Sequence, residues 1–229
     1  MRNSKILLSL LTITLSSLTS LGQDWSNVMH EELIESLIDP SDSIYIADRN
    51  QLEKVTGYDC TDNMLTFIFT SKTKDKIEIA IEKGVFSRSQ HILELADTVY
   101  KHIHGQKRVD YLKVKNIIDG RYSYGIDATI PKSEIKSMSV IWNRKSLAIP
   151  DTAFSTFYES HLCGKLILVE AYLSKDNKNL FIYISGSDGA GSYSVKFVFD
   201  KVTYITRIVG TNEMTDGFDF LDGTAKVND

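Results

Sequence analysis

Four short apolar runs near the C-terminus constrain the fold more than any other feature of this sequence. They cover residues 166–173, 180–185, 193–199 and 203–209. Each has the length of a β-strand, and turn-forming residues separate it from the next run. Because connections this short join neighbouring antiparallel strands, the pattern predicts a C-terminal antiparallel meander.

Earlier segments also show strand-like alternation. Residues 64–70 and 76–81 flank a polar turn and predict a hairpin, and residues 135–142 and 146–149 predict a second one. Apolar side chains alternate strictly from Tyr122 to Ile130, which predicts another strand that ends before Pro131.

Three segments have helical spacing instead. Apolar residues recur at intervals of three and four in 25–37, before Pro40, and again in 87–105, where Ser87 and Gln90 resemble a capping box. A shorter stripe follows Asp151 in 151–158. The sequence therefore predicts an α+β fold: a mainly antiparallel sheet, made of hairpins and the C-terminal meander, with two or three short amphipathic helices.

The first 22 residues have the pattern of a secretory signal peptide. Arg2 and Lys5 precede an apolar run over residues 6–18, and the small residues Ser20 and Gly22 have cleavage-site spacing. This pattern resembles the export signals of bacterial envelope proteins. It predicts a periplasmic or extracellular protein without a membrane span after signal removal. We expect one α+β domain over 23–210, with a possible subdomain join near residue 105, and an acidic tail over 211–229.

The chain contains two cysteines, Cys60 and Cys163. An even count in an exported chain favours a disulfide between them. Two buried, unlinked thiols are the alternative, because cysteine also behaves as a small apolar residue.

Composition and motifs argue against several functions. With 26 basic and 30 acidic residues and a net charge of −4, the chain is not an obvious partner for nucleic acid. The glycine-rich segment 186–191 lacks the Lys-Ser/Thr pair of a phosphate-binding loop and joins two predicted strands. No motif calls for a cofactor, and we expect none.

Candidate ligand-binding residues are few. Tyr122, Tyr124 and Trp142 could line an aromatic groove, although aromatic residues at strand spacing also form core and cross-strand pairs. Asp188 lies in the 186–192 loop, where it serves either ligand binding or backbone geometry.

The acidic tail offers the one candidate metal site. Asp216, Asp219 and Asp222 are spaced by three, and glycines accompany them, which suits calcium. The order of ligands in an EF-hand is not met. The alternative is a solvated tail, or a tail whose apolar residues pack onto the sheet.

The function expected from these observations is non-catalytic. An exported module would bind an envelope or extracellular protein or glycan through a sheet face. The alternative is an exported hydrolase whose carboxylates, such as Glu170, Asp188 and Asp216, meet only in the folded chain.

Overall fold

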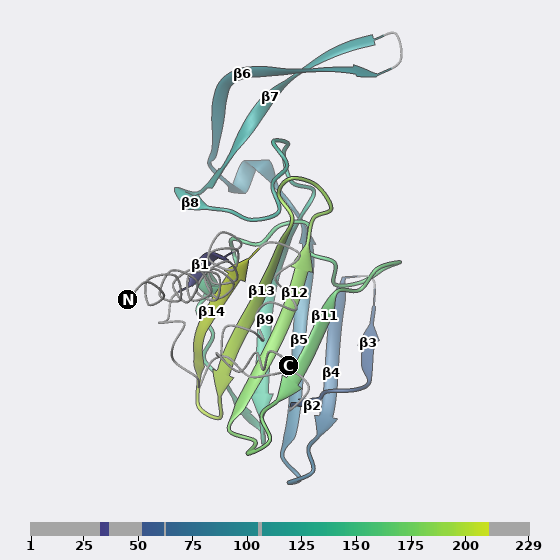
Figure 1. Cartoon of the computed structure of the whole chain (residues 1–229), viewed down its shortest axis with the longest axis vertical. Coiled ribbons are helices and arrows are strands. Elements are labelled where there is room, and N and C mark those ends of the chain that lie inside the picture. The colour runs from purple at the N-terminus through teal and green to yellow at the C-terminus, as the bar shows by residue number, and fades with distance from the viewer. Residues whose placement is uncertain (1–32, 37–51, 62, 105–106, 211–229) are drawn as a thin grey trace, which may run out of the picture.

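The chain folds mainly into two antiparallel β-sheets that pack face to face. The computed structural model describes residues 33–36, 52–61, 63–104 and 107–210. Figure 1 shows the two sheets one behind the other, with a long hairpin that projects beyond one end. Among the described residues, no helix is long and apolar enough to cross a bilayer.

Sheet A contains the C-terminal meander. Its strands lie in the order β1–β14–β13–β12–β11–β2. Their bounds are Leu33–Ser36 (β1), Glu53–Lys54 (β2), Val169–Leu173 (β11), Asn179–Gly186 (β12), Tyr193–Asp200 (β13) and Tyr204–Gly210 (β14). The strands β11 to β14 pair antiparallel in chain order, so the predicted meander is confirmed.

Sheet B contains the earlier hairpins, in the order β10–β9–β5–β4–β3. Its strands are Tyr58–Cys60 (β3), Met64–Thr70 (β4), Lys76–Val85 (β5), Ser133–Trp142 (β9) and Lys145–Ser146 (β10). The pairing of β4 with β5 confirms the first predicted hairpin. The pairing of β9 with β10 confirms the second, although β10 ends sooner than expected.

The main core lies between the two sheets. Alternate residues of β5 point into it, as do alternate residues of β12, because side chains of a strand alternate between its faces. These buried residues include Ile77, Ile79, Ile81, Leu180, Ile182 and Ile184. Sheet A also buries side chains on its other face, where Phe181, Tyr183 and Val198 form a second cluster.

The projecting hairpin belongs to a third, smaller sheet. It consists of β6 (Leu93–His104), β7 (Lys107–Ile118) and β8 (Arg121–Tyr122). Val114 and Ile118 of β7 are buried against Phe86, Ile126 and Tyr158. The base of the hairpin is therefore fixed to the sandwich by apolar packing.

The α+β prediction is wrong, because the described residues contain no α-helix. The predicted helix over 87–105 is a 3-10 turn at Arg88–Gln90 followed by β6, and Ser87 makes no side-chain cap hydrogen bond. The same residues that fit a helical stripe include many β-formers, such as Val99 and Ile103. Backbone pairing with β7 then decides the conformation.

The other two predicted helices are also wrong where the structure describes them. In 25–37, residues 33–36 form β1, which pairs with β14 at the edge of sheet A, while 25–32 and 37 lie outside the described residues. In 151–158, only Asp151–Ala153 form a 3-10 turn. Phe157 and Tyr158 then bridge to Tyr124 and Glu134, and these backbone contacts replace helical ones.

The strand predicted from Tyr122 to Ile130 is largely wrong. Only β8 is regular, and the chain after Tyr122 turns through Gly125, whose φ of +87° is incompatible with an extended strand. A Cβ at this position would meet the Tyr158 carbonyl oxygen at 2.1 Å. Tyr124 and Ile126 are buried whereas Tyr122 and Ile130 are exposed, so the alternation predicted neither a single buried face nor the backbone path.

Glycine is required at position 125, and its backbone holds the turn in place. Its φ of +87° lies in the left-handed region, which residues with a Cβ rarely adopt. Its backbone also donates a hydrogen bond to the carbonyl oxygen of Gly191, at 3.0 Å. The turn therefore holds residues 123–126 against the β12–β13 loop.

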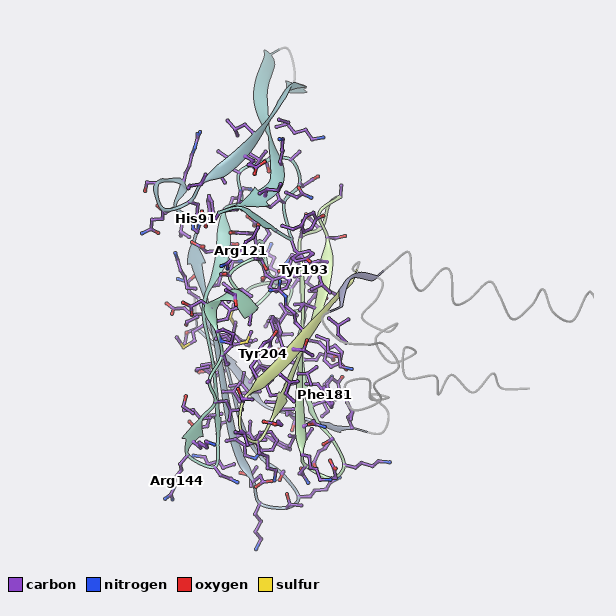
Figure 2. The ribbon with its side chains drawn as sticks, turned by 90° about the vertical axis from the view of Figure 1, so that its left-hand side faces the viewer. His91, Arg121, Arg144, Phe181, Tyr193 and Tyr204 are labelled. Carbon is purple, nitrogen blue, oxygen red and sulfur yellow. A yellow bond between two sulfur atoms is a disulfide. The ribbon has the colours of Figure 1, made fainter. Side chains whose placement is uncertain are left out.

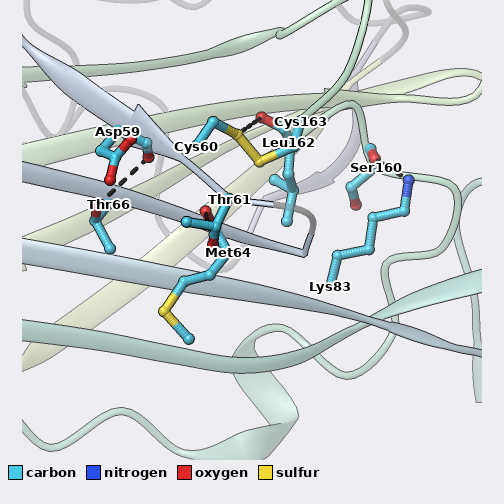
Figure 3. Close-up of a disulfide and its surroundings, with 9 residues drawn as sticks. All are labelled: Asp59, Cys60, Thr61, Met64, Thr66, Lys83, Ser160, Leu162 and Cys163. Atoms are coloured by element: carbon cyan, nitrogen blue, oxygen red, sulfur yellow. Dashed lines mark hydrogen bonds between the residues drawn. A yellow bond between two sulfur atoms is a disulfide. The ribbon is translucent and has the colours of Figure 1, made fainter.

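The predicted disulfide is confirmed. Cys60 of β3 and Cys163 are bonded, with Cα atoms 5.9 Å apart and a sequence separation of 103. Figure 3 shows the bond beside Leu162, whose carbonyl oxygen lies 3.6 Å from Cys60 Sγ. The bond joins the edge of sheet B to the segment that leads into β11 of sheet A.

We expect this bond to stabilise the chain by about 4 to 5 kcal/mol, because it closes a loop on the order of 100 residues in the unfolded state. Urea unfolding with and without a reductant measures the effect. A Cys60→Ala/Cys163→Ala variant is the control, because its midpoint should not respond to the reductant. An unchanged wild-type midpoint after complete reduction would contradict the prediction.

Candidate functional site

A cleft of about 530 Å³ lies between the base of the hairpin and sheet A. Its described lining comes from three separate parts of the chain: Arg121, Tyr122, Thr152, Ala153, Thr156, Tyr204 and Arg207. Its volume falls within the range of about 300–1,000 Å³ typical of small-ligand sites. Figure 2 labels Arg121 near the junction with the hairpin and Tyr204 on sheet A.

Backbone hydrogen bonds bring two of these parts together. Tyr124 N–H donates to the carbonyl oxygen of Thr156 at 2.9 Å, and Tyr158 N–H donates to that of Tyr124 at 3.0 Å. This short parallel pairing places β8 directly beside residues 152–158. The positions of Arg121 and Thr156 in the cleft follow from it.

Arg207 connects the third part of the lining, β14, to residues 152–156. Its Nη1 donates to the carbonyl oxygens of Thr152 and Ala153, at 3.0 and 2.8 Å, and to Thr156 Oγ1 at 3.0 Å. The guanidinium carbon lies 5.0 Å from the centre of the Phe157 ring. Arg207 is buried, so β14 fixes the 152–156 segment through a charge-assisted network.

Tyr122 forms the exposed aromatic wall of the cleft. It is 53% exposed, and its ring packs edge-on against Tyr124 with centroids 5.1 Å apart. Tyr124 in turn stacks on Phe157 at 5.2 Å. The buried rings thus support one side of Tyr122 and leave its remaining surface accessible to a ligand.

The cleft has a positive and hydroxyl-rich lining. Arg121 and Arg207 supply two guanidinium groups, and Thr152 and Thr156 supply hydroxyls. The described lining includes no Asp or Glu. Such a surface can donate several hydrogen bonds and stack one ring, which suits recognition of a polar ligand.

A second polar cluster lies at the base of the hairpin. His91 Nδ1 is 2.7 Å from Asp119 Oδ2, and His91 Nε2 is 3.1 Å from Glu134 Oε2. The imidazole also stacks on Phe86, with centroids 4.6 Å apart. Asp119 follows β7 and Glu134 belongs to β9, so His91 connects the hairpin to sheet B.

The pKa of Asp119 is lowered in this cluster. Burial raises its pKa, but hydrogen bonds from the backbone N–H of Ile92 and from His91 outweigh burial and hold the pKa below its usual value. Lys136 Nζ lies 2.6 Å from Glu134 Oε1 and adds a positive charge on the other side. The cluster is an ion network that connects the base of the hairpin to the two packed sheets.

The structure separates the four residues predicted to bind a ligand. Tyr122 lines the cleft, whereas Tyr124 is buried beneath it. Trp142 is 2% exposed and lies in the main core. Asp188 is exposed on the β12–β13 loop.

That loop is packed more closely than a free hairpin connection. Ser187 is buried, and its N–H donates to the carbonyl oxygen of Glu159 at 2.9 Å. A Cβ on Gly191 would lie 2.5 Å from the carbonyl oxygen of Ile126. The glycines of this loop therefore allow a close backbone approach rather than phosphate binding.

The predicted metal and hydrolase sites gain no support from the described residues. Asp216, Asp219 and Asp222 lie outside them, and no group of three potential ligands occurs within them. Glu170 contacts Lys54 Nζ at 2.5 Å and accepts a hydrogen bond from the Tyr172 hydroxyl at 2.8 Å. Glu170 of β11 thus forms an ion pair with Lys54 of the neighbouring strand β2.

Sequence analysis missed most residues of the cleft. Arg121, Thr152, Thr156 and Tyr204 carry no local motif, because they are far apart in the sequence. Arg207 offered one signal, since it is a charged residue within the apolar strand 204–210. A charge in a buried strand requires partners, and here those partners are the walls of the cleft.

Comparisons with protein-family models, curated proteins and solved structures gave no match for this chain.

We expect Asp119→Asn to lower stability by about 1 kcal/mol at pH 6, because it weakens hydrogen bonds to a charged acceptor. Asn tolerates the positive φ of 54° at this position. Since the folded pKa of Asp119 is lowered, its contribution is present above about pH 4 and is lost as the pH falls through the folded pKa.

Urea unfolding at pH 6 and near pH 2.5 measures this difference. Asp188→Asn is the matched control, because Asp188 is an exposed carboxylate and should change stability by less than about 0.5 kcal/mol at either pH. An equal loss for Asp119→Asn at both values would show that its carboxylate charge does not contribute.

Proposed function

We propose that this protein is an exported, non-catalytic binding module whose cleft holds part of an envelope or extracellular glycan. The observation that carries the proposal is the exposed Tyr122 ring beside hydroxyl and guanidinium donors in a cleft of about 530 Å³. An aromatic ring offers a flat apolar surface to a sugar ring, while the polar groups bind its hydroxyls.

Two further observations support export. The first 22 residues have the pattern of a secretory signal peptide. The Cys60–Cys163 disulfide fits a chain that folds in an oxidising compartment. Either the periplasm or the extracellular medium would provide such conditions.

The test is a glycan-array screen of the chain purified after export, followed by calorimetry with each bound glycan. We expect Tyr122→Ala to weaken binding by at least about fivefold, through loss of the stacking surface. Tyr58→Ala is the matched control, because Tyr58 is 55% exposed on β3 and does not line the cleft.

Two results would contradict the proposal. One is the absence of binding across the array by a folded chain. The other is binding that Tyr122→Ala and Tyr58→Ala weaken equally, since the ligand would then contact another surface.

A further inference from the structure

We infer that Arg121 makes the cleft selective for a ligand that carries a compact oxyanion, such as a carboxylate, sulfate or phosphate group. The inference rests on the proposed function, because it names the class of ligand for the same cleft. It begins from the position of Arg121 on β8, at the rim of the cleft.

Arg121 has no ion-pair partner among the described residues. Asp119 lies two positions away, and the charge of Arg121 helps to lower the pKa of this carboxyl group. The Asp119 oxygens make their short contacts elsewhere: Oδ2 lies 2.7 Å from His91 Nδ1, and Oδ1 accepts from the backbone N–H of Ile92 at 2.8 Å. Asp119 is therefore held in the His91 cluster and forms no ion pair with Arg121.

The interior of the cleft is lined by Thr156 and Arg207. Arg207 Nη1 donates to two carbonyl oxygens and to the Thr156 hydroxyl, and these bonds hold the wall of the cleft in place. Because Thr156 Oγ1 accepts from Arg207, its own hydroxyl hydrogen is directed elsewhere and can donate to a ligand. The chain as a whole has a net charge of −4, so this cleft differs in character from the average surface.

Guanidinium chemistry explains the selectivity. Two parallel N–H groups of Arg match the two oxygens of a carboxylate, sulfate or phosphate, and the opposite charges shorten and strengthen these bonds. A neutral hydroxyl offers one acceptor and no charge.

Calorimetry with four probes tests the inference on the exported full chain. The probes are a uronic-acid oligosaccharide, its carboxyl-reduced neutral counterpart, a sulfated oligosaccharide of equal length, and inorganic phosphate. We expect at least one anionic probe to bind about tenfold or more tightly than the neutral one, with affinity that falls as salt increases.

Arg121→Gln should remove this preference, with a loss of about tenfold for the anionic probe and little change for the neutral one. Arg121→Lys should recover only part of it, because Lys cannot form the bidentate contact. Arg144→Gln is the matched control, since Arg144 is also exposed and Figure 2 places it at the opposite end of the molecule.

The outcomes separate the inference from the proposed function. Binding of an acidic oligosaccharide that depends on Arg121 supports both the inference and the proposed function, and it identifies the acidic group. Binding of phosphate alone that depends on Arg121 supports the inference and identifies a free anion as the ligand. Equal binding of the neutral and acidic oligosaccharides, or no effect of Arg121→Gln, overturns the inference while Tyr122-dependent binding keeps the proposed function. If a folded chain binds no probe and no glycan, both fail.

Discussion

The buried guanidinium of Arg207 is the interaction on which the cleft depends. It comes from β14 of sheet A and donates to the carbonyl oxygens of Thr152 and Ala153 and to the hydroxyl of Thr156. Those residues carry the chain to Phe157, which packs under the guanidinium and beside Tyr124. Arg207 thus fixes residues 152–156, and the backbone pairing of Tyr124 with this segment then positions β8 and Tyr122.

Sequence periodicity was sufficient to predict the strands that pair in the sheet with the strands next to them in the chain. The strands β11 to β14 are such a case, because short turns leave little choice of partner. Periodicity failed for β6, where apolar residues at helical spacing were also compatible with a strand. Pairing with β7 decided between the two, and a sequence pattern does not contain that long-range information.

The 151–158 segment shows a different limit. Its apolar stripe predicted burial correctly, since Ala153, Phe154 and Phe157 all lie in the main core. The chain nevertheless turns through 154–156 and forms no helix, because Phe157 and Tyr158 pair through bridges with residues 124 and 134. The same bridges assemble the cleft, so its residues could not be grouped before the fold was known. Only Tyr122 was both predicted as a candidate and found there.

We propose that the cleft holds an anionic ligand against Arg121 and Tyr122. A crystal structure of the exported chain with a saturating uronic-acid oligosaccharide would reveal where the ligand binds. We expect ligand density in the cleft, with a carboxylate within about 3 Å of the Arg121 guanidinium and a sugar ring against Tyr122. Density for the ligand on another surface, with the cleft holding only solvent, would contradict it.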